Sequence, residues 1–225
     1  MGKPHTDSGD PRSKRPQRRG SPKPKFVEQR NEEVQARPLR PLNEKQRKYI
    51  DSIENHAMVV ATGWAGTSKT YIPTVLACQK LRTHQIDKIV FTRPNISNSK
   101  SLGFFGGDLI EKMQNWLMPV MNILREQFNE ETLEIYLKRG QIEFVPMEVV
   151  KGYSAENCFF IVDEAEDLTI DEAKKIVTRQ GKGCKMVLCG DVFQSELGSK
   201  SGLAWIAEMV KKYPNLNTGL IEFDH

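Results

Sequence analysis

The chain has 225 residues, of which 38% are hydrophobic, and a formal net charge of +4. A chain of this length can bury one sizeable core, so we expect one domain with appendages. No apolar run approaches the length that a membrane span requires, and no secretory signal is present. The four cysteines form no CxxC pair, and we interpret them as small buried side chains in a reducing cytoplasm. Composition therefore favours a soluble cytoplasmic protein without a membrane partner.

Basic residues are concentrated at the N-terminus. Residues 1–38 carry ten Lys or Arg side chains and five acidic ones, with many Pro and Gly residues and few large apolar side chains. This composition predicts a disordered basic tail, followed by a folded domain over residues 39–225. The tail is either a flexible arm that contacts nucleic acid phosphates or a solvated segment that aids solubility.

The folded part is predicted to begin with a helix. Asn43 is placed to cap it, and Tyr49, Ile50 and Ile53 form its apolar face. Gln46 lies on this helix, and its amide is placed to read the adenine edge by a bidentate hydrogen bond. The alternative is that Gln46 is an ordinary exposed helix glutamine.

A strand, a loop of small residues and a second helix follow. The apolar run of residues 57–61 has the length and branching of a buried parallel strand, and an apolar-periodic segment begins at Tyr71. Between the two lie Gly63, Trp64, Ala65, Gly66, Thr67, Ser68, Lys69 and Thr70. This arrangement is typical of a phosphate-binding loop, whose backbone N–H groups and helix N-terminus would bind ATP. Lys69 would reach the β- and γ-phosphates, and the Thr70 hydroxyl would ligate Mg²⁺.

The loop departs from the usual pattern at one position. The pattern is Gly, four residues, then Gly-Lys-Ser/Thr, and Ser68 stands where the second glycine belongs. A side chain here crowds the backbone as it approaches the phosphates, so we expect a weakened affinity for ATP. Taken alone, the segment is also compatible with an ordinary strand, turn and helix that carries a lysine by chance.

The next strand is predicted over residues 88–92 and ends at Arg93 and Pro94. A polar, glycine-rich loop over residues 95–107 follows, at the end of a strand where open α/β sheets place ligands. Phe104 and Phe105 in this loop either stack on bases or anchor the loop to the core. Helices are then predicted over residues 108–124 and 130–139, a third strand over 141–146 and a short turn over 147–152.

Two carboxylates follow the next buried strand, which covers residues 158–162. Asp163 would hold Mg²⁺ through its water shell, and Glu164 would polarise the attacking water in ATP hydrolysis. Adjacent acids are common on protein surfaces, so this signal becomes specific only together with the upstream phosphate loop.

The remaining elements are a helix over residues 169–180 that Thr169 caps, a strand over 185–191, a final helix opened by Ser201 and a last strand over 220–223. The Gly-Asp-x-x-Gln motif after residue 189 places Gln194 beside the γ-phosphate, where it would sense that group. A simple turn is the alternative interpretation of this motif.

In this order the motifs resemble the ATPase half of superfamily-one helicases, and most closely the PhoH-like ATPases. The segments that carry the resemblance are Thr92-Arg93-Pro94, Leu102-Gly103-Phe104, Gly107-Asp108-Leu109, Asp163-Glu164-Ala165-Glu166, Thr178-Arg179, the Gly190 to Gln194 motif and Ser201-Gly202-Leu203. The resemblance implies an α/β fold: a single RecA-like P-loop domain with a mostly parallel sheet flanked by helices. The strand of residues 186–190 would lie between the phosphate-loop strand and the Asp163 strand. The resemblance also implies ATPase activity, RNA-directed or helicase-like work, and assembly into homo-oligomers such as rings.

We therefore expect an ATP hydrolase with Mg²⁺ as its metal and single-stranded nucleic acid, RNA rather than DNA, as its partner. Lys69, Glu164 and Gln194 would be the catalytic residues. Arg93 and Arg179 are candidates for an arginine that stabilises the transition state in place or in a neighbouring subunit, or they are simply ion-pairing residues. The alternatives are a nucleotide-holding switch with little turnover, which Ser68 favours, and a small-molecule kinase. The kinase is disfavoured because Glu164 and Gln194 suit water as the acceptor.

Overall fold

The computed structural model describes residues 1–2, 38–94 and 108–223. The predicted basic tail and the loop of residues 95–107, which contains Phe104 and Phe105, lie outside the described residues. Within the described residues, no helix is both long enough and apolar enough to cross a membrane.

The described residues form one sheet of six parallel strands in the order β3-β2-β4-β5-β1-β6. The strands are β1 (Met58–Gly63), β2 (Lys88–Thr92), β3 (Ile142–Phe144), β4 (Cys158–Val162), β5 (Lys185–Gly190) and β6 (Thr218–Phe223). β5 pairs with both β1 and β4, so the strand predicted between the phosphate-loop strand and the Asp163 strand is confirmed. The RecA-like α/β arrangement expected from the motif order is therefore the arrangement found.

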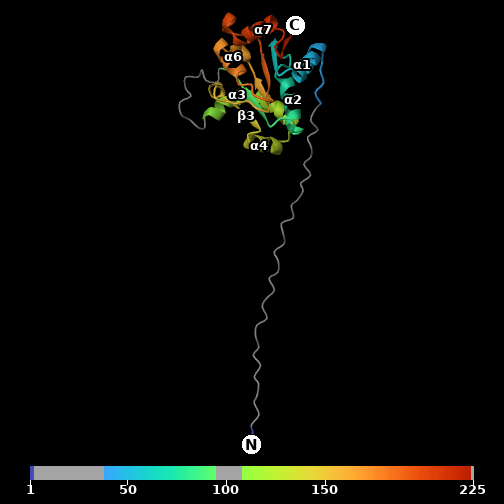
Figure 1. Cartoon of the computed structure of the whole chain (residues 1–225), viewed down its shortest axis with the longest axis vertical. Coiled ribbons are helices and arrows are strands. Elements are labelled where there is room, and N and C mark those ends of the chain that lie inside the picture. The colour runs from blue at the N-terminus through green and yellow to red at the C-terminus, as the bar shows by residue number, and fades with distance from the viewer. Residues whose placement is uncertain (3–37, 95–107, 224–225) are drawn as a thin grey trace. The chain divides into compact units, whose positions relative to one another are not determined.

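Helices cover both faces of the sheet, as Figure 1 shows for α1 and α2 on one side and α6 and α7 on the other. The first core cluster is bounded by α1 (Glu44–Asn55), α2 (Tyr71–Arg82), α3 (Asp108–Gln127) and α4 (Glu130–Lys138), and the second by α5 (Met147–Val150), α6 (Ile170–Val177) and α7 (Gly202–Lys212). Val59 and Ala61 face the first cluster, whereas Val60 faces the second. The central strands β1, β2, β4 and β5 are buried on both faces and mostly apolar, so polar function is left to their ends.

The helix ends follow local capping chemistry. The Asn43 side chain accepts a hydrogen bond from the backbone of Gln46, and Thr169 forms a capping box with Glu172, so both predicted caps are confirmed. α6 ends at Val177, earlier than predicted, because Gln180 forms an isolated bridge with Ala155. Residues 147–152, predicted as a turn, begin with the short helix α5. Two short 3₁₀ helices, η1 (Ala165–Asp167) and η2 (Gly198–Lys200), complete the described elements.

The strand register brings the polar motifs to one edge of the sheet. Thr92 at the end of β2 pairs with Val162 at the end of β4, and Thr62 on β1 pairs with Gly190 on β5. The residues that follow these strands therefore emerge side by side at the carboxyl edge, where open parallel sheets place their ligands.

Candidate nucleotide site

The loop between β1 and α2 closes over its own lysine. The Lys69 Nζ donates hydrogen bonds to the carbonyls of Gly63 at 2.5 Å and Trp64 at 2.6 Å, and to the Thr67 hydroxyl at 3.2 Å. Desolvation lowers the Lys69 pKa, while nearby carboxylates act in the opposite direction. The ammonium group is thus held over the concave side of the loop, where a bound phosphate would take over these contacts.

Ser68 adopts the backbone conformation that the glycine of the usual motif would adopt at this position. Its φ is +67°, in the left-handed region that a non-glycine residue occupies at a cost of about 1 kcal/mol. The Gln46 Nε2 donates to the Ser68 hydroxyl at 3.3 Å, and the Gln46 Oε1 accepts from the Leu42 backbone at 2.8 Å. Gln46 is only 6% exposed, so its interpretation as an exposed helix glutamine is wrong. In this structure Gln46 joins α1 to the loop rather than facing open solvent.

A pocket of about 670 Å³ lies beside the loop. It is lined by Leu42, Asn43, Glu44, Lys45, Gln46, Lys48, Gly66, Thr67 and Phe223. The end of β6 packs directly against the start of the loop. A side chain added at Gly63 would overlap the Phe223 carbonyl.

The two predicted magnesium ligands contact each other directly. The Thr70 hydroxyl donates to the Asp163 Oδ1 at 2.6 Å, which joins the start of α2 to the end of β4. A hydroxyl and a carboxylate oxygen at this separation are donors that suit Mg²⁺, which completes its shell with waters and phosphate oxygens. Within the described residues no group of three or more His, Cys, Asp or Glu side chains could hold a metal. The residues present therefore fit a magnesium–nucleotide complex.

Glu164 forms an ion pair with Arg93, whose side chain comes from the neighbouring strand end. The backbone of Glu164 is left-handed, with φ +47° and ψ +43°, and this conformation directs the chain away from β4 into η1. Desolvation lowers the Arg93 pKa, and Asp163, Glu166 and Asp167 act in the opposite direction. Arg93 is thus, like Lys69, a cation that faces carboxylates at the carboxyl edge of the sheet.

Gln194 is tied to the acidic residue of its own motif. Its Nε2 donates to the Asp191 Oδ2 at 2.7 Å, while the Asp191 Oδ1 accepts from the Phe193 backbone at 3.0 Å. Asp191 is buried, whereas the Gln194 side chain is exposed at the same edge as the phosphate loop. The motif therefore forms a closed turn in which Asp191 holds the Gln194 amide.

Arg179 lies away from this group. Its carbonyl accepts from the Ala155 backbone, and its Nη1 donates to the Lys151 carbonyl at 3.1 Å, both before the start of β4. This is the opposite edge of the sheet from Asp163, so Arg179 does not join the phosphate loop of its own chain.

Two residues at the site, Tyr49 and Glu166, were not predicted from the sequence to have a functional role. The Tyr49 hydroxyl donates to the Lys69 carbonyl at 2.9 Å, inside the core. Glu166 is buried, and its Oε2 has no hydrogen-bond partner among the residues that the structure describes. Its backbone carbonyl accepts from the hydroxyls of Ser195 and Ser201. Burial raises the Glu166 pKa. Glu166 had a signal as the last residue of the Asp163 motif, but Tyr49 looked only like one apolar position of a helix.

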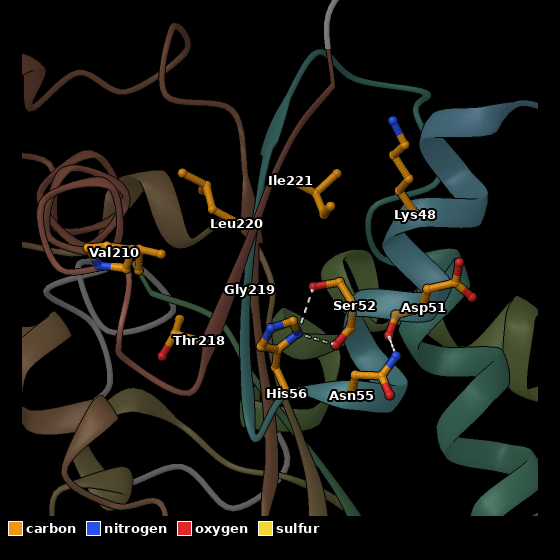
Figure 2. Close-up of a pocket in the computed structure, with 11 residues that line it drawn as sticks. Lys48, Asp51, Ser52, Asn55, His56, Val210, Thr218, Gly219, Leu220 and Ile221 are labelled. Atoms are coloured by element: carbon orange, nitrogen blue, oxygen red, sulfur yellow. Dashed lines mark hydrogen bonds between the residues drawn. The ribbon is translucent and has the colours of Figure 1, made fainter.

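A second pocket, of about 480 Å³, lies along β6 and contains none of the predicted site residues. Figure 2 shows Leu220 and Ile221 directed to opposite sides of the strand, with Lys48, Asp51 and Ser52 on the adjoining α1. Its side-chain hydrogen bonds are local to α1, such as that between Ser52 and His56.

Comparison with known families shows to which family the chain belongs. The family described as PhoH-like protein matches residues 38–224. The chain belongs to the PhoH-like family. It is 38% identical over 181 residues to the PhoH-like protein of Bacillus subtilis, an alignment that covers 80% of this chain and 56% of that one. It is 33% identical over 171 residues to Protein PhoH of Escherichia coli, covering 74% and 48%. The chain thus spans about half the length of the curated relatives it matches.

Solved structures give more distant likenesses. The UvsW helicase from bacteriophage T4 is similar with a TM-score of 0.48 and 10% identity, covering 80% of this chain and 60% of that one. The large terminase ATPase domain of Thermus phage P74-26 has a TM-score of 0.44 and 12% identity, covering 82% and 81%. Family membership and the loop geometry together make this PhoH-like domain a P-loop nucleotide-binding domain.

Proposed function

We propose that this PhoH-like domain hydrolyses ATP as a magnesium complex and couples hydrolysis to single-stranded nucleic acid, RNA rather than DNA. The observation that carries the proposal is the contact between Thr70 and Asp163, which sets the phosphate loop against the acidic strand end. ATP hydrolysis needs phosphate binding, a metal position and a base at one place, and the two elements bring these groups together.

Each residue has a defined task in this proposal. The loop from Gly63 to Thr70 would cradle the phosphates through its backbone N–H groups, and Lys69 would move from its own carbonyl contacts onto the β- and γ-phosphates. Thr70 and Asp163 would hold Mg²⁺, which neutralises charge on the phosphates when bound. The pocket beside Gln46 would take the base.

The attack by water would depend on the other acidic residue. Glu164 would orient the water and accept its proton once the carboxylate leaves Arg93. Gln194 would report the γ-phosphate to the turn that it forms with Asp191. If Arg179 stabilises the transition state, it must act in the site of a neighbouring copy of the chain. For this reason we propose a homo-oligomer, of which a ring is one form.

A second candidate function is a nucleotide-holding switch with little turnover. The engagement of Glu164 by Arg93 and the positive φ of Ser68 both favour it, because one restrains the base and the other strains the loop. The nucleic acid partner and a cytoplasmic location rest on composition and on the family resemblance.

The test is steady-state phosphate release from ATP and Mg²⁺, with and without single-stranded RNA or DNA of matched length. Wild type is compared with Glu164→Gln and Lys69→Ala, and with Glu208→Gln as a matched control on the exposed side of α7. We expect Glu164→Gln to lower kcat by about 10²–10⁴-fold while ATP still binds. If wild type and Glu164→Gln both bind ATP but neither releases phosphate, the chain is a nucleotide-holding switch instead.

A further inference from the structure

Two cysteines face each other across neighbouring strands. Cys158 is the first residue of β4, and Cys184 directly precedes β5. The pairing of Phe159 with Lys185 places the two cysteines opposite each other one step earlier. The Cys158 thiol donates to the Cys184 sulfur at an Sγ–Sγ distance of 3.7 Å. Adjacent strands lie about 4.8 Å apart, within the Cα separations that a disulfide accepts.

The two thiols differ in access and in acidity. Cys158 is fully buried, whereas Cys184 is 6% exposed, beneath an exposed turn formed by Lys182 and Gly183. The hydrogen bond from Cys158 lowers the Cys184 pKa, and the same bond raises the Cys158 pKa. Because the thiolate is the reactive form, Cys184 is the nucleophile and Cys158 is the resolving thiol.

We propose that Cys158 and Cys184 are a peroxide-sensitive pair that forms an intramolecular disulfide between β4 and β5. The Cys184 thiolate attacks hydrogen peroxide, so that an S–O bond forms, the O–O bond breaks and hydroxide leaves. The Cys158 sulfur then attacks the sulfenic acid, forming the S–S bond as the S–O bond breaks. The proton of Cys158 leaves with that oxygen as water. Two thiols and one peroxide thus give one disulfide and two waters.

The other two cysteines provide internal controls. Cys78 on α2 is fully buried, and burial raises its pKa to about 12. Cys189 is also fully buried, and desolvation raises its pKa well above the ordinary value. Neither is expected to react while the domain stays folded. The bond would close a loop that contains η1 and α6, and would join the strands at the edge opposite the nucleotide site.

The experiment exposes the folded, full chain to hydrogen peroxide, blocks free thiols with N-ethylmaleimide after unfolding and maps the peptides without reduction. We expect a loss of two hydrogen atoms, one crosslinked peptide pair joining Cys158 to Cys184, and alkylation of Cys78 and Cys189. Dithiothreitol should restore four alkylated cysteines. Alkylation of all four after peroxide, a disulfide involving Cys78 or Cys189, or a crosslinked dimer would each overturn the proposal.

Variants assign the order of the steps. Cys78→Ala should keep the disulfide, and Cys184→Ser should abolish both the disulfide and labelling by dimedone, a reagent for sulfenic acid. Cys158→Ser should leave a dimedone-reactive Cys184, and a dimedone-labelled Cys158 in Cys184→Ser would reverse the roles. The wild-type peptide map decides the proposal even where a variant fails to fold, and the result is independent of ATP hydrolysis.

Discussion

The hydroxyl of Tyr49 satisfies the carbonyl of Lys69, which Pro73 leaves without its usual helical partner. In an α-helix the N–H of residue 73 would bond to this carbonyl, but proline has no N–H. Pro73 lies in the first turn of α2, where the missing donor is tolerated, and Tyr49 from α1 donates at 2.9 Å instead. Pro73 thus leaves free the acceptor through which Tyr49 ties α1 to the phosphate loop.

Tyr49→Phe should remove this tie. It leaves the buried Lys69 carbonyl unsatisfied, and we expect the free energy of unfolding to fall by about 1–3 kcal/mol. ATP binding should weaken because the main chain of Lys69 is no longer fixed. Chemical denaturation and nucleotide titration measure the two effects. Tyr136→Phe, on α4 against Phe128, is the matched control. Equal losses in both variants would refute a specific role for the Tyr49 hydroxyl.

Ser68→Gly should tighten ATP binding by about 3- to 10-fold, because glycine adopts a φ of +67° without strain. The gain is reduced by loss of the hydrogen bond from Gln46. Gly66→Ala is the opposite test: its φ is +81° and the space around it is open, so only backbone strain is added and affinity should fall. Calorimetric titration of both variants checks the pair. Weaker binding by Ser68→Gly would mean that the serine hydroxyl, and not glycine freedom, supports the loop.

Arg93→Ala distinguishes two roles for this arginine. Its guanidinium is engaged by Glu164, and the pair is partly exposed, so we expect kcat to change by no more than about 10-fold. An arginine that stabilises the transferring phosphate contributes about 10³–10⁵-fold. A fall of that size in phosphate release would therefore assign Arg93 to the transition state. Arg93→Lys keeps the charge without the planar fork and serves as the control.

Glu166→Gln should change how stability depends on pH. Burial raises the Glu166 pKa above its ordinary 4.5, so the folded chain binds this proton more tightly than the unfolded chain does. Stability contributed by this group therefore falls as pH rises from 4.5 through the raised value, and it stays lower at neutral pH. The neutral amide should flatten that slope and raise the neutral-pH Tm. Glu134→Gln, an exposed change on α4, should leave the slope in this window in place.

The sequence predicted the strands well because the central ones are buried on both faces and read as nearly continuous apolar runs. The position of β5 between the phosphate-loop strand and the Asp163 strand was implied by the family resemblance and is confirmed. The sequence also placed Thr70, Asp163, Glu164 and Gln194 at strand and helix ends that the register then brought to one edge. These predictions depend on local pattern together with one topological rule, and both act strongly in parallel sheets.

What the sequence did not predict are contacts that depend on which side chains meet in space. The hydrogen bond from the Tyr49 hydroxyl to Lys69 and the pairing of Cys158 with Cys184 join residues 20 and 26 positions apart. The contact of the Lys69 ammonium with the Gly63 carbonyl is local, but it depends on how the loop folds. Arg179 looked equivalent to Arg93 as a motif arginine, yet the fold puts it at the other edge. Side-chain partners across elements carry no periodic signal, so only the folded chain reveals them.

The contact between Thr70 and Asp163 also has a kinetic consequence. The Thr70 hydroxyl donates to the Asp163 carboxylate at 2.6 Å, which is a charge-assisted hydrogen bond. A free magnesium ion would have to break this bond and lose bound water before it gained the two oxygens as ligands. A metal that arrives already bound to the nucleotide phosphates exchanges that bond for several others at once. If the proposed function is right, we therefore expect the metal to enter bound to the nucleotide, and magnesium alone to leave the hydrogen bond between Thr70 and Asp163 in place.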